Sequence, residues 1–219
     1  MTRREWLLGV AGFALATRLG AKSGSLRIYL ARHGESEANA AHTIAGWTDA
    51  PLTAKGREQA HALAEALKGI RLDAVYSSTL SRSRETAQIA APGMRAEALP
   101  ALRERNFGQF EKGSDTAPEF IRRRFLDDDN LGGAETGAQF LERVRAAVTG
   151  IVRQHPTGAI LIAAHRFTNQ KILQSLMSYT PAEANAIVQD NDEVYSMDIV
   201  PGRPPLLWKL IREKNLGDL

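Results

Sequence analysis

A short apolar segment, residues 26–31, runs directly into the sequence Arg-His-Gly-Glu-Ser at positions 32–36, and this junction constrains the fold more than any other feature of the chain. The segment reads Leu-Arg-Ile-Tyr-Leu-Ala, and its branched and aromatic residues are typical of a buried β-strand. In open α/β sheets, such strands present ligand-binding groups at their carboxyl ends. We therefore expect an α/β fold whose chemistry lies just beyond Ala31.

Further along the chain, segments of strand character alternate with segments of helical periodicity. Phe140, Val144, Val148 and Ile151, for example, recur at the spacing of one helix face. Alternation of this kind predicts a layered α/β domain. The predicted strands are residues 26–31, 73–77, 159–164, 193–199 and 206–211, and the predicted helices are residues 54–68, 80–91, 137–154 and 169–178.

Residues that follow the first two predicted strands suit the binding of a phosphoryl group. Arg32 and Arg82 each offer a planar guanidinium group, which binds phosphate oxygens in pairs and stays charged at any working pH. His33 can attack phosphorus as a neutral imidazole if a hydrogen bond holds one ring nitrogen protonated while the other faces the substrate. The nearby guanidinium groups lower the pKa of this imidazole. We therefore expect His33 to be the nucleophile.

Two further groups are needed for phosphoryl transfer. His165 ends the apolar run 159–164, and we expect it to donate a hydrogen bond to the phosphoryl oxygens in the transition state. The leaving alkoxide must also be protonated, and a carboxyl group can do this if burial raises its pKa. The candidate acids are Glu104, Glu111 and Glu135, and structural or substrate-orienting roles are expected for the last two.

Six blocks of the sequence, in the same order, resemble those of the histidine phosphatase superfamily, branch 1, the phosphoglycerate mutase-like group. The resemblance spans about residues 26–210 and implies a three-layer α/β/α sandwich with a mostly parallel central sheet. It therefore indicates one domain over residues 26–219. The blocks are residues 32–36, residues 46–53 with Gly56 and Gln59, residues 76–87, residues 102–111, residues 132–136 with Arg143, and residues 159–165.

The resemblance also implies roles for individual side chains. It implies a phosphohistidine intermediate on His33 and phosphate binding by Arg82, the family's second phosphate-binding arginine. It places the proton donor at Glu104, whose carboxylate would later deprotonate the water that cleaves phosphohistidine. Asn39, three positions after the first motif, is expected to bind substrate together with Arg32 and the other arginines of the site.

Two positions depart from the family pattern. Arg166 follows the second histidine where the family commonly has glycine or another small residue, and Lys112 stands where a glycine often follows the glutamate. Arg166 either binds a second anionic group on the substrate or turns away and pairs with residues 190–192. The charged segment 109–133 is likewise either a cap inserted over the pocket mouth or a solvated helix with a charged end. The substrate class depends on which alternative holds for Arg166 and which holds for this segment.

Residues 1–25 have the layout of an export signal. Arg3 and Arg4 precede a short apolar core, and the sequence 14–16 reads Ala-Leu-Ala, a small-residue cleavage pattern. The paired arginines predict a twin-arginine leader, and we expect the mature protein in the periplasm after contact with that export machinery. The apolar run is too short for a normal membrane span, which needs about 20 residues. The alternative interpretations are an amphipathic surface helix and an incorrectly assigned start codon, and with either of them we expect a cytoplasmic protein.

Composition excludes several other classes of function. The net charge of +3 equals that of residues 1–25 alone, which contain four basic side chains and one acidic one, so a nucleic-acid partner is not expected. The 219-residue chain has no cysteine, which excludes a cysteine-linked lipid anchor. It has no spacing typical of a calcium loop, a zinc motif or a nucleotide-binding loop, so we expect neither a metal nor a cofactor.

The predicted function is a phosphomonoesterase that acts on a small phosphorylated molecule through phosphohistidine. A mutase is the first alternative, although the compact length without the leader favours hydrolysis. An inactive anion-binding module is the second alternative, and the complete set of Arg32, His33, Arg82, Glu104 and His165 argues against it.

Overall fold

A mixed six-stranded sheet organises the molecule, and the strand order along it is β3-β2-β4-β1-β5-β6. The computed structural model describes residues 24–210. Neighbouring strands are parallel from β3 through β2 and β4 to β1, whereas β5 and β6 continue the sheet in antiparallel fashion. The sheet is thus mostly parallel. The strands are β1 (Leu26–Arg32), β2 (Ala74–Ser78), β3 (Glu97–Leu99), β4 (Gly158–Ala164), β5 (Val194–Ile199) and β6 (Leu206–Leu210).

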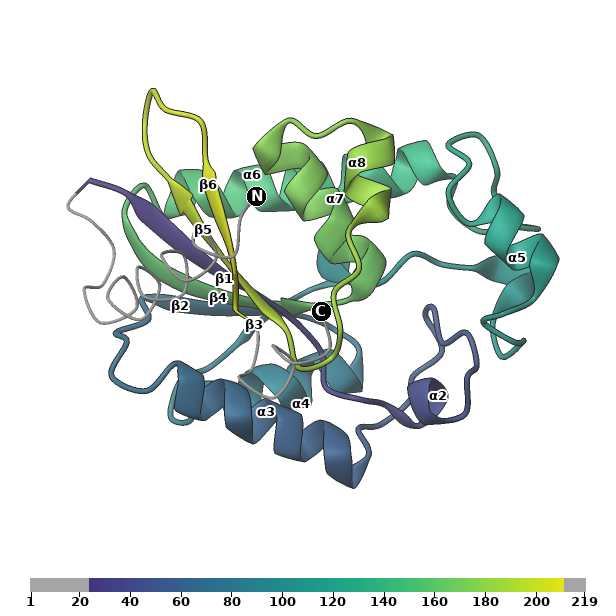
Figure 1. Cartoon of the computed structure of the whole chain (residues 1–219), viewed down its shortest axis with the longest axis horizontal. Coiled ribbons are helices and arrows are strands. Elements are labelled where there is room, and N and C mark those ends of the chain that lie inside the picture. Colours follow the sequence, from purple (N-terminus) through teal and green to yellow (C-terminus); the bar gives the residue numbers. More distant parts are fainter. Residues whose placement is uncertain (1–23, 211–219) are drawn as a thin grey trace, which may run out of the picture.

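Helices cover both faces of this sheet, which confirms the three-layer α/β/α sandwich. Figure 1 shows α3 and α4 below the sheet and α6, α7 and α8 above it, while α2 and α5 lie beyond the carboxyl end of β1. The helices are α2 (Glu37–Ala40), α3 (Ala54–Ala66), α4 (Ser81–Ala90), α5 (Pro118–Arg123), α6 (Gly137–Gln154), α7 (Arg166–Met177) and α8 (Pro181–Ala186), with short 3₁₀ turns at Pro100–Leu102 and Gly108–Phe110.

The alternation of side chains along β1 divides the core into two parts. Ile28 and Leu30 belong to one buried cluster together with Phe140 of α6. Tyr29 belongs to a second cluster together with Leu63 of α3. Successive residues of a strand point to opposite faces, so a fully apolar strand such as β1 needs a helical layer on each side. This requirement fixes β1 at the centre of the sheet.

Several short elements were not predicted from the sequence. Strand β3 has only three residues at the sheet edge, too few for a period-two pattern, and the short α2, α5 and α8 have no apolar stripe of their own. Helix α7 begins at Arg166, three residues before its predicted start. Apart from Phe167, its first turn is polar, so hydropathy gives little helical signal there.

Two predictions fall partly outside the described residues. The export leader predicted for residues 1–25 lies outside them except for its last two positions, and so does Ile211 at the end of the last predicted strand. Within residues 24–210, no helix is long and apolar enough to cross a membrane.

Candidate active site

The carboxyl ends of the parallel strands bring the predicted catalytic residues to one edge of the sheet. Arg32 ends β1 and His33 follows it, Arg82 lies in the first turn of α4 after β2, and His165 follows β4. The imidazole rings of His33 and His165 stand edge to face, with their centroids 5.0 Å apart. Residues separated by more than 130 positions in the sequence therefore form one cluster. All are buried except Arg32, which is half-buried.

The hydrogen bonds of His33 define which of its ring nitrogens carries the proton. Nδ1 lies 2.7 Å from the carbonyl oxygen of Gly34. A carbonyl can only accept, so Nδ1 must donate. Nε2 accepts from the Nε–H of Arg82 at 3.3 Å and is therefore unprotonated in the neutral ring. Burial, followed by the charges of Arg82 and Arg32, holds the pKa of His33 well below its ordinary value.

His165 is fully buried and keeps one ring nitrogen without a hydrogen-bond partner among the described residues. Its Nε2 lies 2.7 Å from the hydroxyl oxygen of Ser78, whereas Nδ1 has no partner. Burial and then the charge of Arg82 hold the pKa of His165 well below its ordinary value. An unpaired buried polar atom is costly, so Nδ1 is suited to a bound ligand.

The two arginines of the cluster are held by neutral groups. Arg82 donates to the carbonyl oxygens of Gly46 at 2.8 Å and Thr48 at 3.1 Å, and Arg32 donates to that of Gln189 at 2.8 Å. Burial is the main cause that lowers the pKa of Arg32, to about 10, with the charge of Arg166 next. Neither arginine belongs to any of the ion pairs found in residues 24–210. Their positive charges thus remain available to an anionic ligand.

Glu104 lines a pocket together with Arg32, His33 and Arg82, and its carboxyl group lies against the start of α7. That group accepts hydrogen bonds from the backbone N–H groups of Phe167 at 3.2 Å and Thr168 at 3.1 Å, and from that of Arg105 at 3.0 Å. These bonds and the arginine charges favour the carboxylate, but burial has the larger effect and raises the pKa of Glu104. The raised pKa favours a protonated carboxyl group closer to neutral pH.

The other two candidate acids support the site from outside. Glu111 accepts hydrogen bonds from the backbone N–H groups of Trp47 at 2.8 Å and Thr48 at 3.0 Å, so it braces the loop whose carbonyl oxygens hold Arg82. Glu135 forms a two-point ion pair with Arg143, at 2.6 and 2.9 Å. Their geometry is that of structural residues.

Arg143 links Glu135 to the backbone around Glu104, the predicted acid. It donates to the carbonyl oxygens of Arg103 at 3.1 Å and Glu104 at 3.3 Å. Trp47 Nε1 also donates to the Glu104 carbonyl, at 2.7 Å. The backbone of the acid-bearing loop is thereby fixed from two sides.

A pocket of about 370 Å³ opens beside these residues, and the two predicted substrate-binding side chains also line it. Asn39 uses its Oδ1 to accept hydrogen bonds from Ser36 at the start of α2, which leaves its amide N–H groups for a ligand. Arg166 also lines the pocket and pairs with neither Asp190 nor Asp192 among the ion pairs of the described chain.

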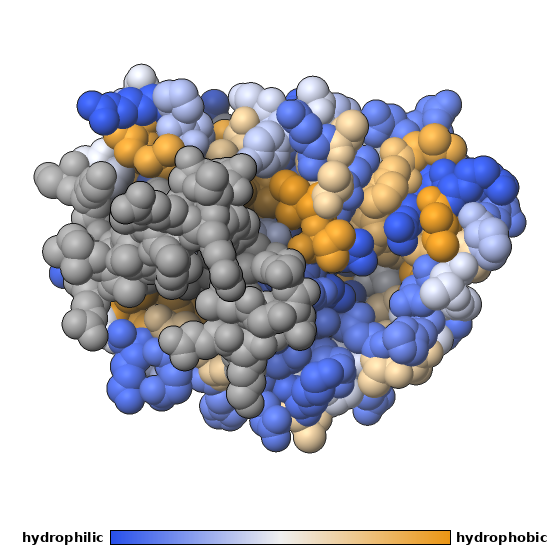
Figure 2. Space-filling view, viewed as in Figure 1, coloured by the Kyte–Doolittle hydropathy of each residue, from blue (hydrophilic) through white to orange (hydrophobic). Residues whose placement is uncertain are grey.

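The outer wall of the pocket comes from the charged segment 109–133. Thr116, Phe120, Ile121 and Arg124 from this segment line the pocket. Ile121 is 45% exposed, and Figure 2 shows hydrophobic groups interspersed with hydrophilic ones over the part of the surface that contains α5. The mouth therefore offers a ligand both apolar and cationic contacts. Among the described residues, no group of three or more His, Cys, Asp and Glu side chains could hold a metal ion.

Comparison with known proteins shows which family the chain belongs to. A family model described as the histidine phosphatase superfamily (branch 1) matches residues 28–210. The chain belongs to the histidine phosphatase superfamily. This confirms the resemblance inferred from the sequence blocks.

The proteins that this chain resembles include some named as mutases and some named as phosphatases. A protein of Proteus mirabilis (strain HI4320), named probable phosphoglycerate mutase GpmB, is 33% identical over 149 residues, which cover 64% of this chain and 69% of that protein. The crystal structure of phosphoglycerate mutase from Bacillus anthracis str. Sterne matches with a TM-score of 0.73 and 25% identity, covering 85% of this chain and 93% of that one. A mutant phosphoserine phosphatase from Entamoeba histolytica, in complex with phosphoserine, shares the fold, with a TM-score of 0.74, 23% identity and coverages of 83% and 94%.

The structure adds residues to this histidine phosphatase site that sequence reasoning missed. Ser78 contacts His165, and Gln189 positions Arg32, although neither residue stands out in the sequence. Arg124 and the exposed His42 also line the pocket. The one usable signal was the position of Ser78 directly after a predicted strand.

Proposed function

We propose that this protein is a phosphomonoesterase that forms a phosphohistidine intermediate on His33. The observation that supports the proposal best is the neutral His33 ring, with its proton on Nδ1 and its Nε2 beside Arg82. A ring in this state attacks phosphorus without a separate base. Two guanidinium groups that form no ion pair within residues 24–210 lie next to it, as a charged phosphoryl group requires.

The reaction takes place in two steps. First, the lone pair of His33 Nε2 forms a bond to phosphorus while the ester P–O bond breaks, and Glu104 gives its proton to the departing alkoxide oxygen. Second, a water oxygen attacks the phosphorus of phosphohistidine while the Glu104 carboxylate takes a proton from that water. The P–N bond breaks, its electron pair returns to Nε2, and inorganic phosphate leaves.

Three side chains stabilise the transferring phosphoryl group in this proposal. Arg32 and Arg82 bind its equatorial oxygens, because no ion pair in the described part of the chain offsets their charges. Ser78 can donate its hydroxyl proton to Nε2 of His165, because its oxygen already accepts from the N–H of Leu80. His165 then carries its proton on Nδ1, the unpaired nitrogen, and donates it to a phosphoryl oxygen.

The outer guanidinium groups support a substrate with a second anionic group. Arg166 and Arg124 line the pocket beyond Arg32, and neither belongs to an ion pair in the described part of the chain. The charge of Arg166 lowers the pKa of both Arg32 and Arg124, so Arg166 lies near each of them. A carboxylate or a second phosphate at the far end of the substrate would balance this charge.

A mutase is the second candidate, because relatives at 33% identity are named probable phosphoglycerate mutases. The two reactions share the first step and differ in whether water or a second hydroxyl group accepts the phosphoryl group from His33. Release of inorganic phosphate from an aryl phosphate, measured with and without an added acceptor, separates them.

The decisive experiment replaces the nucleophile. We expect His33→Ala to abolish hydrolysis of an aryl phosphate, and we expect the wild-type protein, denatured in alkali during turnover, to carry an acid-labile phosphoryl group. Phosphate release and retained label are the two measurements. Full activity of His33→Ala would exclude the mechanism, whereas His61→Gln, an exposed histidine on α3, is the control that should retain full activity.

We further propose that residues 1–25 direct export through the twin-arginine route into the periplasm, on the basis of their sequence. Replacement of Arg3 and Arg4 by lysine should leave precursor in the cytoplasm. Fractionation of cells that express the two forms tests this, and equal export of both would reject the proposal.

A further inference from the structure

Three polar side chains hold the turn of residues 33–35, and the mechanism above uses none of them. Two of them hold the peptide that joins His33 to Gly34. Asn191, from the loop before β5, donates from Nδ2 to the His33 carbonyl at 2.6 Å. Thr86 of α4 accepts from the N–H of Gly34 at 3.0 Å. The C=O group and the N–H group of this first peptide therefore each form a hydrogen bond to a side chain.

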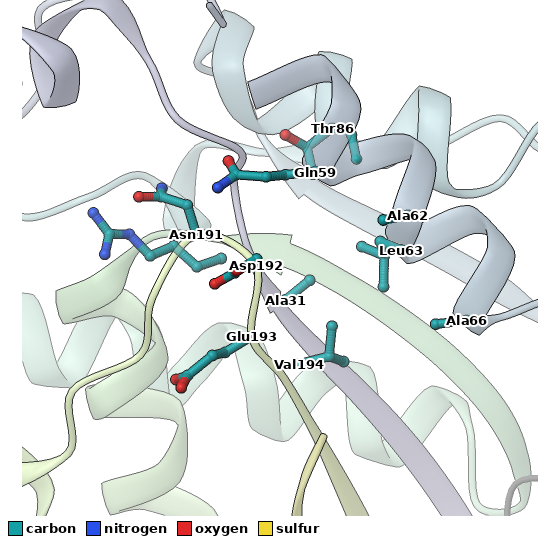
Figure 3. Close-up of a pocket in the computed structure, with 12 residues that line it drawn as sticks. Ala31, Gln59, Ala62, Leu63, Ala66, Thr86, Asn191, Asp192, Glu193 and Val194 are labelled. Atoms are coloured by element: carbon teal, nitrogen blue, oxygen red, sulfur yellow. The ribbon is translucent and has the colours of Figure 1, made fainter. Parts of the chain in front are cut away.

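The third side chain holds the next peptide, which joins Gly34 to Glu35. Gln59 of α3 accepts from the N–H of Glu35 through its Oε1, at 2.7 Å. The carbonyl oxygen of the same peptide belongs to Gly34 and accepts from Nδ1 of His33, at 2.7 Å. Figure 3 shows Gln59, with Thr86 and Asn191, beside a small cavity at the end of β1. Gln59 is thus connected to the catalytic ring through one peptide unit.

The direction of this peptide bears on which ring nitrogen of His33 is protonated. A trans peptide is planar, and its C=O and N–H groups point in opposite directions. The bond from Glu35 N–H to Gln59 therefore fixes the direction of the Gly34 carbonyl. If the peptide turned over, an N–H group would face Nδ1, the proton of the neutral ring would move to Nε2, and no lone pair would remain there for attack.

Gly34 itself does not supply this constraint. Glycine has few steric limits on its backbone angles, so the residue at position 34 does not by itself fix the following peptide. No other residue fits at position 34, because a Cβ there would overlap the carbonyl oxygen of Gly56 at the start of α3. Gln59 lies on the same helix one turn later. Helix α3 therefore leaves room only for a glycine at position 34, and it also supplies Gln59, whose side chain holds the turn.

We infer that Gln59 is a positioning residue that keeps His33 in its attacking tautomer through the Gly34–Glu35 peptide. The inference rests on the proposed role of His33 as the nucleophile. Hydrogen bonds in series polarise one another, so the bond to Gln59 also strengthens the acceptor that faces Nδ1.

Paired variants of Gln59 test the inference. Gln59→Met keeps the length of the side chain but removes the acceptor, whereas Gln59→Glu keeps an acceptor oxygen. We expect Gln59→Met to lower kcat for an aryl phosphate by roughly 10- to 100-fold, the scale for a misplaced catalytic group, with KM within about threefold of wild type. Gln59→Glu should keep kcat within about threefold of the wild-type value. Leu63→Val, on the same cavity wall, is the packing control and should keep the wild-type kcat.

The tautomer itself is measured by NMR with ¹⁵N-labelled histidine. The chain has five histidines, and a His33→Gln variant assigns the signals of His33. The wild type and Gln59→Glu should show a protonated Nδ1, whereas Gln59→Met should show a shift toward protonated Nε2. An unchanged tautomer in Gln59→Met, even with a lower melting temperature, would make Gln59 a packing residue only. This measurement needs no turnover, so it stays valid if the proposed hydrolysis fails.

Discussion

Burial shifts the pKa values of the two proton-carrying groups of the site in opposite directions, and both shifts suit the proposed reaction. It lowers the pKa of His33 and raises that of Glu104. Both shifts follow from the same cause, because a low-dielectric environment disfavours whichever form is charged. At neutral pH the imidazole is therefore neutral and ready to attack, while the carboxyl group holds a proton over a wider pH range than an exposed glutamate does.

At the scale of single residues, the first prediction concerns Glu104 as the acid. We expect Glu104→Gln to slow the hydrolysis of alkyl phosphates more than that of nitrophenyl phosphate, because a basic alkoxide needs a proton and a nitrophenolate scarcely does. The excess loss in kcat should be roughly 10²-fold or more, which is the usual size of general acid catalysis. Steady-state kinetics on both esters provide the measurement, and equal losses on both would assign the acid to another group.

The second residue-scale prediction concerns Arg166. We expect Arg166→Gln to raise KM by about 10- to 100-fold for substrates with a second carboxylate or phosphate, from the ~1.5–3 kcal/mol of hydrogen bonds to charged groups. Simple aryl phosphates should be affected far less. Arg122→Gln is the matched control, because Arg122 is exposed on α5 and does not line the pocket. A uniform loss on both kinds of substrate would make Arg166 structural.

At the scale of elements, the site depends on loops that are anchored to one another and not only on the sheet. The loop 46–48 holds Arg82 through its carbonyl oxygens and is itself held by Glu111. Helix α3 shapes the turn after β1 in a comparable way, through Gly56 and Gln59. Loops carry the ligand contacts, while the rigid strands and helices determine where the loops begin and end.

Glu111 provides the prediction at this scale. Glu111→Gln leaves one oxygen where the carboxylate has two, so the hydrogen bonds to Trp47 and Thr48 cannot all be kept. We expect a loss of about 1.5–3 kcal/mol in the free energy of unfolding, and a raised KM for aryl phosphates because Arg82 is less well held. Urea denaturation and steady-state kinetics measure the two effects. The exposed Glu58→Gln should change neither, and a fall in stability without any rise in KM would separate this loop from phosphate binding.

For the whole molecule, the two buried histidines couple stability to pH. His33 and His165 have a pKa in the folded state that lies well below the unfolded value of about 6.5, so the unfolded chain takes up protons first as the pH falls. Their contribution to stability is therefore complete above pH ~6.5 and is lost progressively below it. Glu104 acts in the opposite sense, because its raised pKa makes it stabilising at low pH and less so as the pH rises through its folded value.

The resulting prediction compares how steeply the free energy of unfolding changes with pH in the wild type and in His165→Gln. Between pH ~6.5 and 5.5, the free energy of unfolding of His165→Gln should fall less steeply than that of the wild type, by up to about 1.4 kcal/mol per pH unit. Urea denaturation at several pH values gives both slopes. Identical slopes in the two proteins would contradict the inferred burial of a neutral His165, and His61→Gln should keep the wild-type slope.

The sequence by itself determined the fold class, the superfamily and the strand-end positions of Arg32, His33, Arg82 and His165. It could do so because a buried strand is a local apolar pattern, and because parallel strands deliver their carboxyl ends to one edge wherever they pair. Short elements such as β3 and α8 have no such pattern and depend on their neighbours.

Only the tertiary structure decided how these residues are held. The direction of Arg166, the bracing of Arg82 through Glu111 and the contact of Gln59 with the turn after His33 join residues that are distant in sequence. Each depends on packing between helices and loops, because the orientation of a side chain and the partner of a backbone N–H group follow from the three-dimensional arrangement and leave no periodic trace in the sequence.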